Sequence, residues 1–128
     1  MYRVPTESKV WGTACHVFSD PHAAVSILET IKGGYCSRHF HSQRVNRFIV
    51  QSGVIEVVEY DPGGTLEVSR VRMEAGDTHD VEAGVVHRFE VLVAGVVIEV
   101  YYPSRPTDRV GLDDIVRLDI GGRTLKAA

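Results

Sequence analysis

Three histidines in the sequence have a spacing that suits a metal site. His39 and His41 lie two residues apart in a predicted β-strand, and His87 begins another predicted strand. Side chains two residues apart on a strand leave the same face, so His39 and His41 form a candidate chelating pair. An inward-facing His87 can complete the set in a closed barrel. Three neutral imidazoles suit a divalent transition metal (Zn, Ni, Fe, Co, Cu or Mn), and we predict such a site here.

Asn46 is the fourth candidate ligand. Its amide oxygen is neutral and is a weaker donor to these metals than a carboxylate. We therefore expect Asn46 to ligate weakly or only through water. An ion held by three neutral imidazoles would keep its full positive charge, which favours an anionic substrate or hydroxide as a further ligand.

The elements that must position these residues are predicted to be β-strands. Short apolar segments rich in Val, Ile, Tyr and Phe are separated by turn sequences, which is typical of an all-β sandwich or barrel. Asp61-Pro62-Gly63-Gly64 has the composition of a hairpin tip between residues 54–59 and 65–71. The predicted strands cover residues 9–18, 23–31, 35–41, 47–52, 53–60, 65–73, 78–82, 86–93 and 95–102.

Composition and length indicate one globular domain. The 128 residues are 44% apolar and 24% charged, with a net charge of −3. We expect a single domain over residues 1–128, with a barrel core at about 23–103 and a C-terminal extension, 104–128, that adds a short strand or helix outside the barrel.

The same composition argues against nucleic-acid and membrane partners. The 14 Lys and Arg are scattered among 17 Asp and Glu and form no basic run that could follow a phosphate backbone. No segment approaches the roughly 20 apolar residues of a membrane-spanning helix, and residues 1–5 do not open a signal peptide. We expect a cytoplasmic protein whose partner is a small molecule.

Two motifs in the chain resemble those of the cupin superfamily. The first cupin motif is Gly-x5-His-x-His-x3–4-Glu-x6-Gly, and the residues on its positions are Gly33, His39, His41, Asn46 and Gly53. The second is Gly-x5-Pro-x-Gly-x2-His-x3-Asn, and the residues on its positions are Gly76, Glu82, Gly84, His87 and Val91. Three positions depart from the motifs, namely Asn46, Glu82 and Val91. The resemblance implies an all-β, single-domain cupin: a double-stranded β-helix, or jelly-roll barrel. It also implies a homodimer.

Within the cupins, the chain resembles the C-terminal domain of type II mannose-6-phosphate isomerases, which are often fused to GDP-mannose pyrophosphorylase. The matching segments are Trp11-Gly12, Phe48-Ile49-Val50, His87-Arg88, Ile98-Glu99-Val100 and Asp113-Asp114-Ile115-Val116-Arg117. This resemblance implies a metal-dependent isomerase that interconverts the aldose and ketose forms of a sugar phosphate. The family's metal ligands are typically Gln, His, Glu and His, so His39 replaces the Gln and Asn46 replaces the Glu.

An isomerase of this kind needs a base and a cationic clamp for phosphate. His79, in the strand before His87, could be the base if it points into the barrel, and a metal-bound hydroxide is the alternative. Arg44, Arg88 and Arg117 could bind the phosphate because guanidinium meets its oxygens in a bidentate geometry. Each arginine could equally be a solvated surface residue.

Two other functions fit the same residues. A three-histidine ferrous site leaves coordination positions open for oxygen and a chelating substrate, as in some cupin dioxygenases. A non-catalytic module could instead use the barrel to bind a sugar or another small metabolite. The sequence leaves these alternatives open.

Overall fold

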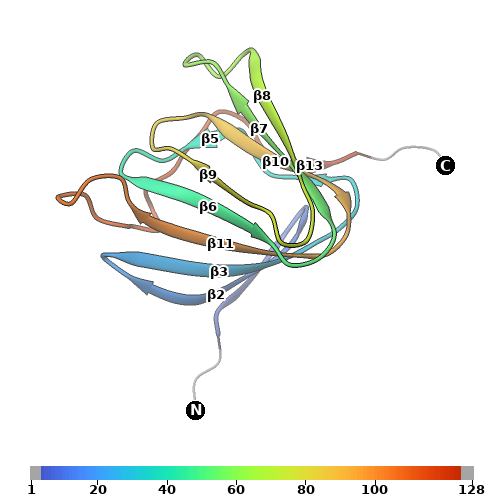
Figure 1. Cartoon of the computed structure of the whole chain (residues 1–128), viewed down its shortest axis with the longest axis horizontal. Coiled ribbons are helices and arrows are strands. Elements are labelled where there is room, and N and C mark those ends of the chain that lie inside the picture. Colours follow the sequence, from blue (N-terminus) through green and yellow to red (C-terminus); the bar gives the residue numbers. More distant parts are fainter. Residues whose placement is uncertain (1–3, 125–128) are drawn as a thin grey trace.

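The computed structural model describes residues 4–124, which form two β-sheets packed face to face (Figure 1). The first sheet has the strand order β1-β2-β3-β11-β6-β9. The second has the order β12-β5-β10-β4-β13, and β7 pairs with both β10 and β8. The strand bounds are β1 Thr6–Lys9, β2 Gly12–Asp20, β3 Ala23–Thr30, β4 Gly34–Tyr35, β5 His39–Phe40, β6 Arg44–Val50, β7 Val54–Tyr60, β8 Glu67–Met73, β9 Thr78–Val81, β10 His87–Val93, β11 Val96–Pro103, β12 Val116–Arg117 and β13 Gly122–Arg123.

The prediction of an all-β barrel is confirmed. Every regular element in the described part of the chain is a strand, and all strand pairs are antiparallel. The predicted hairpin is β7–β8, with its tip at residues 61–66. Among residues 4–124 there is no helix with the length and apolar character needed to span a membrane.

Two predicted strands are wrong in their extent. The expected strand 9–18 is a hairpin, because the chain reverses between Lys9 and Gly12, which pair with each other. The expected strand 35–41 is interrupted between β4 and β5. There the amide of Arg38 donates to the carboxylate of Asp119 (2.6 Å) and not to a neighbouring strand. The carbonyl of Arg38 also accepts from the amide of Leu118 (2.8 Å), whereas the amide of Cys36 still donates to Phe89 of β10 (3.3 Å). Bonds to the C-terminal segment thus replace the expected ladder at Arg38.

Alternation along the strands separates the core from the surface. In β10 the side chains of His87, Phe89 and Val91 are buried between the sheets, whereas Arg88 and Glu90 point to the other face. The buried apolar residues that pack with them in one cluster include Trp11, Leu28, Phe48, Ile55, Met73, Val81 and Val97. The histidine therefore enters the barrel as part of the inward pattern of its strand.

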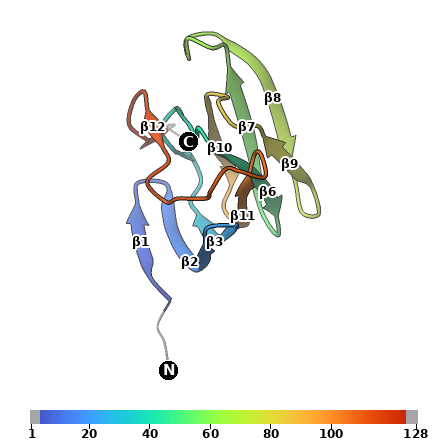
Figure 2. The same ribbon diagram turned by 90° about the vertical axis from the view of Figure 1, so that its left-hand side faces the viewer.

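The C-terminal extension returns to the barrel. After β11 the chain crosses in front of the sheets and reaches β12, close to β1 (Figure 2). The strand β12 pairs with β5, and β13 pairs with β4. The expected short extra strand is therefore present as two short pairings. Both pairings lie beside the segment that carries His39.

Two motif glycines provide a matched stability test. Gly53 and Gly76 both have positive φ, 79° and 93°, so alanine is strained at either position. A Cβ on Gly53 would lie 2.6 Å from the carbonyl oxygen of Val93, whereas a Cβ on Gly76 meets nothing within 4 Å. We expect G76A to lower the free energy of unfolding by about 1 kcal/mol and G53A by at least about 2 kcal/mol in urea denaturation. Equal losses would show that the contact at Gly53 relaxes without cost.

Candidate metal centre

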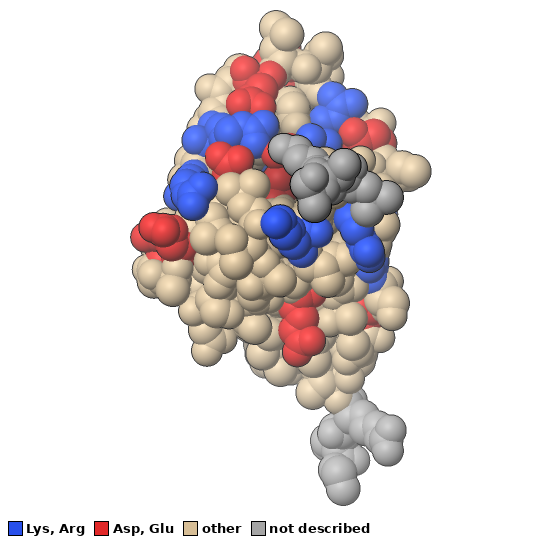
Figure 3. Space-filling view, turned by 90° about the vertical axis from the view of Figure 1, so that its right-hand side faces the viewer, with Lys and Arg blue, Asp and Glu red and all other residues tan. Residues whose placement is uncertain are grey.

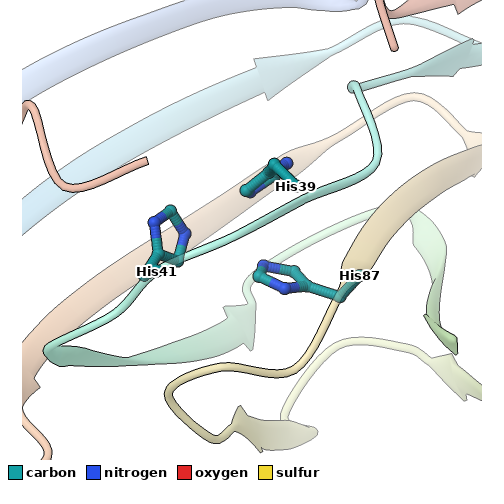
Figure 4. A group of neighbouring side chains, drawn as sticks. All are labelled: His39, His41 and His87. Carbon is teal, nitrogen blue, oxygen red and sulfur yellow. The ribbon is translucent and has the colours of Figure 1, made fainter. Parts of the chain in front are cut away.

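The structure brings His39, His41 and His87 together between the sheets (Figure 4). His39 and His87 lie directly opposite each other in the pairing of β5 with β10, and their ring centroids are 4.4 Å apart. The ring of His41 lies 4.9 Å from that of His39 and 5.4 Å from that of His87. One ring nitrogen from each residue lies within 4.8 Å of the other two, and all three residues are buried.

Backbone carbonyl groups fix the tautomer of all three imidazoles. Each Nδ1–H donates to a main-chain oxygen, which leaves Nε2 with an unprotonated lone pair. The acceptors are the carbonyl oxygens of Ser37 for His39 (2.7 Å), Asp114 for His41 (2.7 Å) and Val85 for His87 (2.9 Å). The buried Nε2 of His41 has no hydrogen-bond partner among the described residues. Three rings are thus held together with Nε2 unprotonated, and Nε2 of His87 accepts a hydrogen bond from the amide nitrogen of Asn46 (3.4 Å).

Burial keeps these imidazoles neutral. It lowers the pKa of His39, His41 and His87 from 6.5 to about 3. The positive charge of Arg44 contributes to the lowering at all three, and the histidines also disfavour one another's protonation. Neutral imidazole is the form that ligates a metal. The geometry, tautomers and charge state therefore fit a divalent transition ion held by three Nε2 atoms.

Asn46 turns its amide nitrogen toward the histidines. Its Nδ2 donates to a carboxylate oxygen of Glu99 (3.1 Å) and lies 3.4 Å from Nε2 of His87. Its oxygen is buried and has no hydrogen-bond partner among the described residues. The carboxylate of Glu99 can only accept a hydrogen bond, so it contacts the NH₂ group of Asn46. In this orientation of the amide, the Asn46 oxygen, which we expected to be a weak ligand, does not face the histidines.

Glu99 is a site residue that the sequence analysis did not single out. Its carboxylate accepts hydrogen bonds from Asn46 and from the hydroxyl of Tyr101 (2.8 Å), and burial raises its pKa above the usual range. The signal was present in the sequence: Glu99 is a charged residue in the apolar segment Val96–Tyr102. It shares the inward face with Val97 and Tyr101, which are both buried.

Asp114 connects the C-terminal segment to the metal centre. Its carboxylate accepts the backbone amides of Ser42 and Gln43 (both 2.8 Å), and its own carbonyl accepts Nδ1–H of His41. The side chain therefore holds the carbonyl that orients a metal-binding ring. This contact gives a structural role to the Asp113-Asp114 pair of the closing motif.

A cavity of about 350 Å³ adjoins the centre. His39 forms part of its wall, and β1, β2, β3, β11 and the C-terminal segment supply most of the rest. Its polar wall residues include Arg44, Glu99, Tyr101, Ser26 and Arg117. A small molecule in this cavity would therefore lie next to a candidate metal ligand.

Arg44 lies in the cavity wall as a buried cation. It is 4% exposed, and its guanidinium lies 3.9 Å from the ring centroid of Tyr101. One NH₂ group donates to the carbonyl of Gly111, while Nε–H has no acceptor. No ion pair between the described residues includes Arg44. A buried guanidinium without a carboxylate partner is a candidate group for binding an anion.

The other predicted contact residues lie in different places. Arg117 is exposed and lines the cavity. Arg88 does not line it, because its neighbour His87 points inward and alternation sends Arg88 to the opposite face, where it pairs with Glu90 (2.6 Å). On the face of the molecule shown in Figure 3, basic and acidic side chains likewise lie next to one another. The proposed phosphate contact at Arg88 is therefore not part of this cavity.

His79 lies outside the cavity wall. Its Nε2 is 2.8 Å from the carboxylate of Glu59, which is directly opposite His87 in the pairing of β7 with β10. This contact joins β9 of one sheet to β7 of the other. The ring of His79 is thus engaged next to the histidine cluster, and its predicted role as a base remains a prediction.

The contact between Asp114 and the loop before β6 can be tested by metal affinity. We expect D114A to raise the metal Kd by about 10- to 100-fold, because the carbonyl that orients His41 loses its support. D113A is the matched control, since Asp113 is exposed and next in the chain, and should change the Kd by less than about twofold. Competition with a chelator measures both. Equal metal affinity in the two variants would contradict the role of Asp114.

The low pKa values predict how acid affects the metal-free protein. The folded pKa of each buried histidine, about 3, is below the unfolded value of 6.5, so the unfolded chain binds more protons between these limits. Stability is therefore fully present above pH 6.5 and falls as the pH drops toward 3, by up to about 1.4 kcal/mol per pH unit for each histidine. Urea unfolding at pH values from about 7 to 5 should show a shallower slope for H39Q than for the parent protein. H22Q, at an exposed histidine, is the control and should keep the parent slope.

Comparison with known proteins supports the fold. No protein-family model matches the sequence, and no curated protein matches it. Among solved structures, oxalate decarboxylase from Bacillus subtilis matches with a TM-score of 0.73 and 15% identity over 90% of this chain and 30% of that one. The formate complex of Lactobacillus farciminis oxalate decarboxylase matches with a TM-score of 0.71 and 17% identity over 90% of this chain and 34% of that one.

The chain thus spans about a third of the length of the solved structures that it matches. The likeness extends over 90% of this chain. Oxalate decarboxylases are cupin-fold proteins. Together with the two antiparallel sheets and the inward three-histidine cluster, this likeness shows that the chain has the cupin fold.

Proposed function

We propose that this cupin binds a divalent metal ion through His39, His41 and His87 and binds a small organic acid beside it. The proposal is carried by one arrangement. Three neutral imidazoles bring one ring nitrogen each within 4.8 Å of one another, and the wall of the adjoining cavity contains Arg44, a buried guanidinium without an ion-pair partner among residues 4–124.

The charges around the cavity favour an anion. Three neutral ligands leave the charge of a bound divalent ion uncompensated, and Arg44 adds a further positive charge. Glu99 offsets at most one of these charges, and its carboxylate is already hydrogen-bonded to Asn46 and Tyr101. A carboxylate is the simplest ligand that can both approach the ion and accept a hydrogen bond from Arg44.

The chemistry can be divided between the ion and the protein. The ion would supply an electrophilic position for one carboxylate oxygen. Arg44 would hold the acid through its guanidinium, and the apolar wall formed by Phe48 and Phe89 would exclude water. The two solved structures described above are oxalate decarboxylases, one of them in complex with formate, and both names denote small carboxylates. The likeness supports the ligand class proposed here.

Sugar-phosphate isomerisation is the second candidate. It is supported by the resemblance to type II mannose-6-phosphate isomerases and by two cavity residues: Arg117 as a phosphate contact and Glu99 as a group that can hold a proton. It has less support than an organic acid, because Arg88 lies outside the cavity and His79 is bonded to Glu59. A ferrous dioxygenase would use the same ion-binding residues, whereas a non-catalytic binding module could bind its ligand in the barrel without a metal.

The first experiment determines metal content and ligand class together. Elemental analysis of protein purified without chelators should find close to one divalent ion per chain. Thermal unfolding of protein loaded with each candidate metal should then show stabilisation by oxalate or acetate that exceeds stabilisation by mannose 6-phosphate. Greater stabilisation by the sugar phosphate would favour the isomerase. Oxygen consumption with iron and an acid would identify a dioxygenase.

Arg44 provides the specific variant for this experiment. R44M keeps the packing against Tyr101 and removes the charge, so oxalate affinity should fall about tenfold or more while metal content is unchanged. R44K retains a charge and should recover part of the affinity. The melting temperature without ligand shows whether each variant is folded. Unchanged oxalate affinity in a folded R44M would place the anion elsewhere.

A further inference from the structure

We infer that the acid bound in this cavity has an apolar body, of the size of a phenyl or branched alkyl group, attached to its carboxylate. This inference rests on the proposed function for the carboxylate end and goes beyond it for the rest of the molecule. Formate, oxalate and sugar phosphates would leave the apolar surface of the cavity uncovered.

The inward face of the first sheet carries one polar and one apolar row. Strand register places His16, Ser26 and Glu99 side by side across β2, β3 and β11. The neighbouring row consists of Ala14, Leu28 and Val97, again across the same three strands. Both rows reach the cavity, through all three residues of the first and through Ala14 and Leu28 of the second. A ligand that extends from the polar row therefore reaches an apolar surface.

The polar row leaves few hydrogen bonds for a ligand. The two ring nitrogens of His16 contact Ser26 (2.9 Å) and Glu7 (2.7 Å). Glu99 already accepts from Asn46 and Tyr101. A sugar has a hydroxyl on nearly every carbon, and each buried hydroxyl that lacks a partner costs about 1–3 kcal/mol. The guanidinium of Arg44 suits one anionic group. Apart from Glu99, the other charged wall residues are Glu7 and Lys9, which pair with each other (2.9 Å), and Arg117, which is exposed.

Further apolar side chains line the cavity, beside the charged residues Glu7, Lys9 and Arg117. Trp11 is buried in the wall, while Val10, Leu112 and Ile120 are wall residues that are 48%, 52% and 86% exposed. Exposed apolar side chains that line one cavity are candidates for contact with an apolar ligand. Contact with an apolar ligand body would remove part of that surface from water.

The volume of the cavity agrees with this class of ligand. Pockets that hold small organic ligands measure about 300 to 1,000 Å³. At about 350 Å³ the cavity lies at the lower end of that range. Formate or oxalate would leave most of it to water, which gains little beside Leu28 and Trp11. An acid with one ring or one branched chain would use both the anion site and the apolar surface.

Trp11 makes the inference directly measurable. It is the single tryptophan of the chain and lines the cavity, so its fluorescence reports a ligand at that wall. The probes are acetate, phenylacetate and cyclohexylacetate, which share one carboxylate and differ in the apolar body. With metal-loaded protein we expect both substituted acids to bind at least about tenfold more tightly than acetate and to change the Trp11 emission.

The exposed wall residues supply matched variants. L112N with I120N should reduce the affinity for phenylacetate about tenfold and leave acetate affinity and metal content unchanged. The control is L66N with V68N, a pair that is 66% and 65% exposed and lies outside the cavity wall. This pair should change neither affinity. Melting temperatures confirm that both double variants are folded.

The outcomes separate this inference from the proposed function. Equal affinity for acetate and phenylacetate would overturn the apolar body and leave the metal-bound acid intact. Equal binding of phenylacetate with and without metal, and in R44M, would overturn the proposed carboxylate site while retaining an apolar pocket. Tighter binding of mannose 6-phosphate than of any of the acids would overturn both.

Discussion

The site depends on three hydrogen bonds from imidazole Nδ1–H groups to main-chain carbonyls. Each acceptor belongs to a place where regular pairing is interrupted: Ser37 lies between β4 and β5, Val85 lies in the turn before β10, and Asp114 lies in the C-terminal segment. A carbonyl within a continuous ladder would already accept an amide. The irregular backbone around the barrel is therefore what allows three neighbouring rings to adopt the same tautomer and share one centre.

Strand alternation explains which parts of this site could be predicted from the sequence. The spacing of His39 and His41 and the inward start of β10 at His87 were enough to place the three rings together. Alternation also excludes Arg88 from the cavity, because it follows His87 directly. The interruption at residues 36–38 could not be predicted, because it depends on Asp119, which is distant in sequence. The cavity could not be predicted for the same reason, since the C-terminal segment, which is distant in sequence, forms part of its wall.

Glu99 determines which atom of the Asn46 amide group faces the histidines. In the pairing of β6 with β11, Asn46 lies opposite Tyr101, and Glu99 lies opposite Phe48 on the same inward face. The motif carboxylate is absent, yet a carboxylate contacts Asn46 from the neighbouring strand. Burial raises the pKa of Glu99, so its negative charge is costly unless a positive group is near. Arg44 and a bound ion are such groups, which ties the charge state of Glu99 to the occupants of the site.

The C-terminal segment joins the metal centre to the cavity. Asp114 positions the carbonyl that orients His41, while Leu112 and Ile115, on either side of it, line the cavity. A ligand that packs against these two side chains buries surface on the segment that holds a metal-binding ring in place. Contacts made by the apolar body of an acid would therefore restrain the same backbone that restrains His41. The cavity wall and the support of His41 thus share one segment, which follows the last long strand of the barrel.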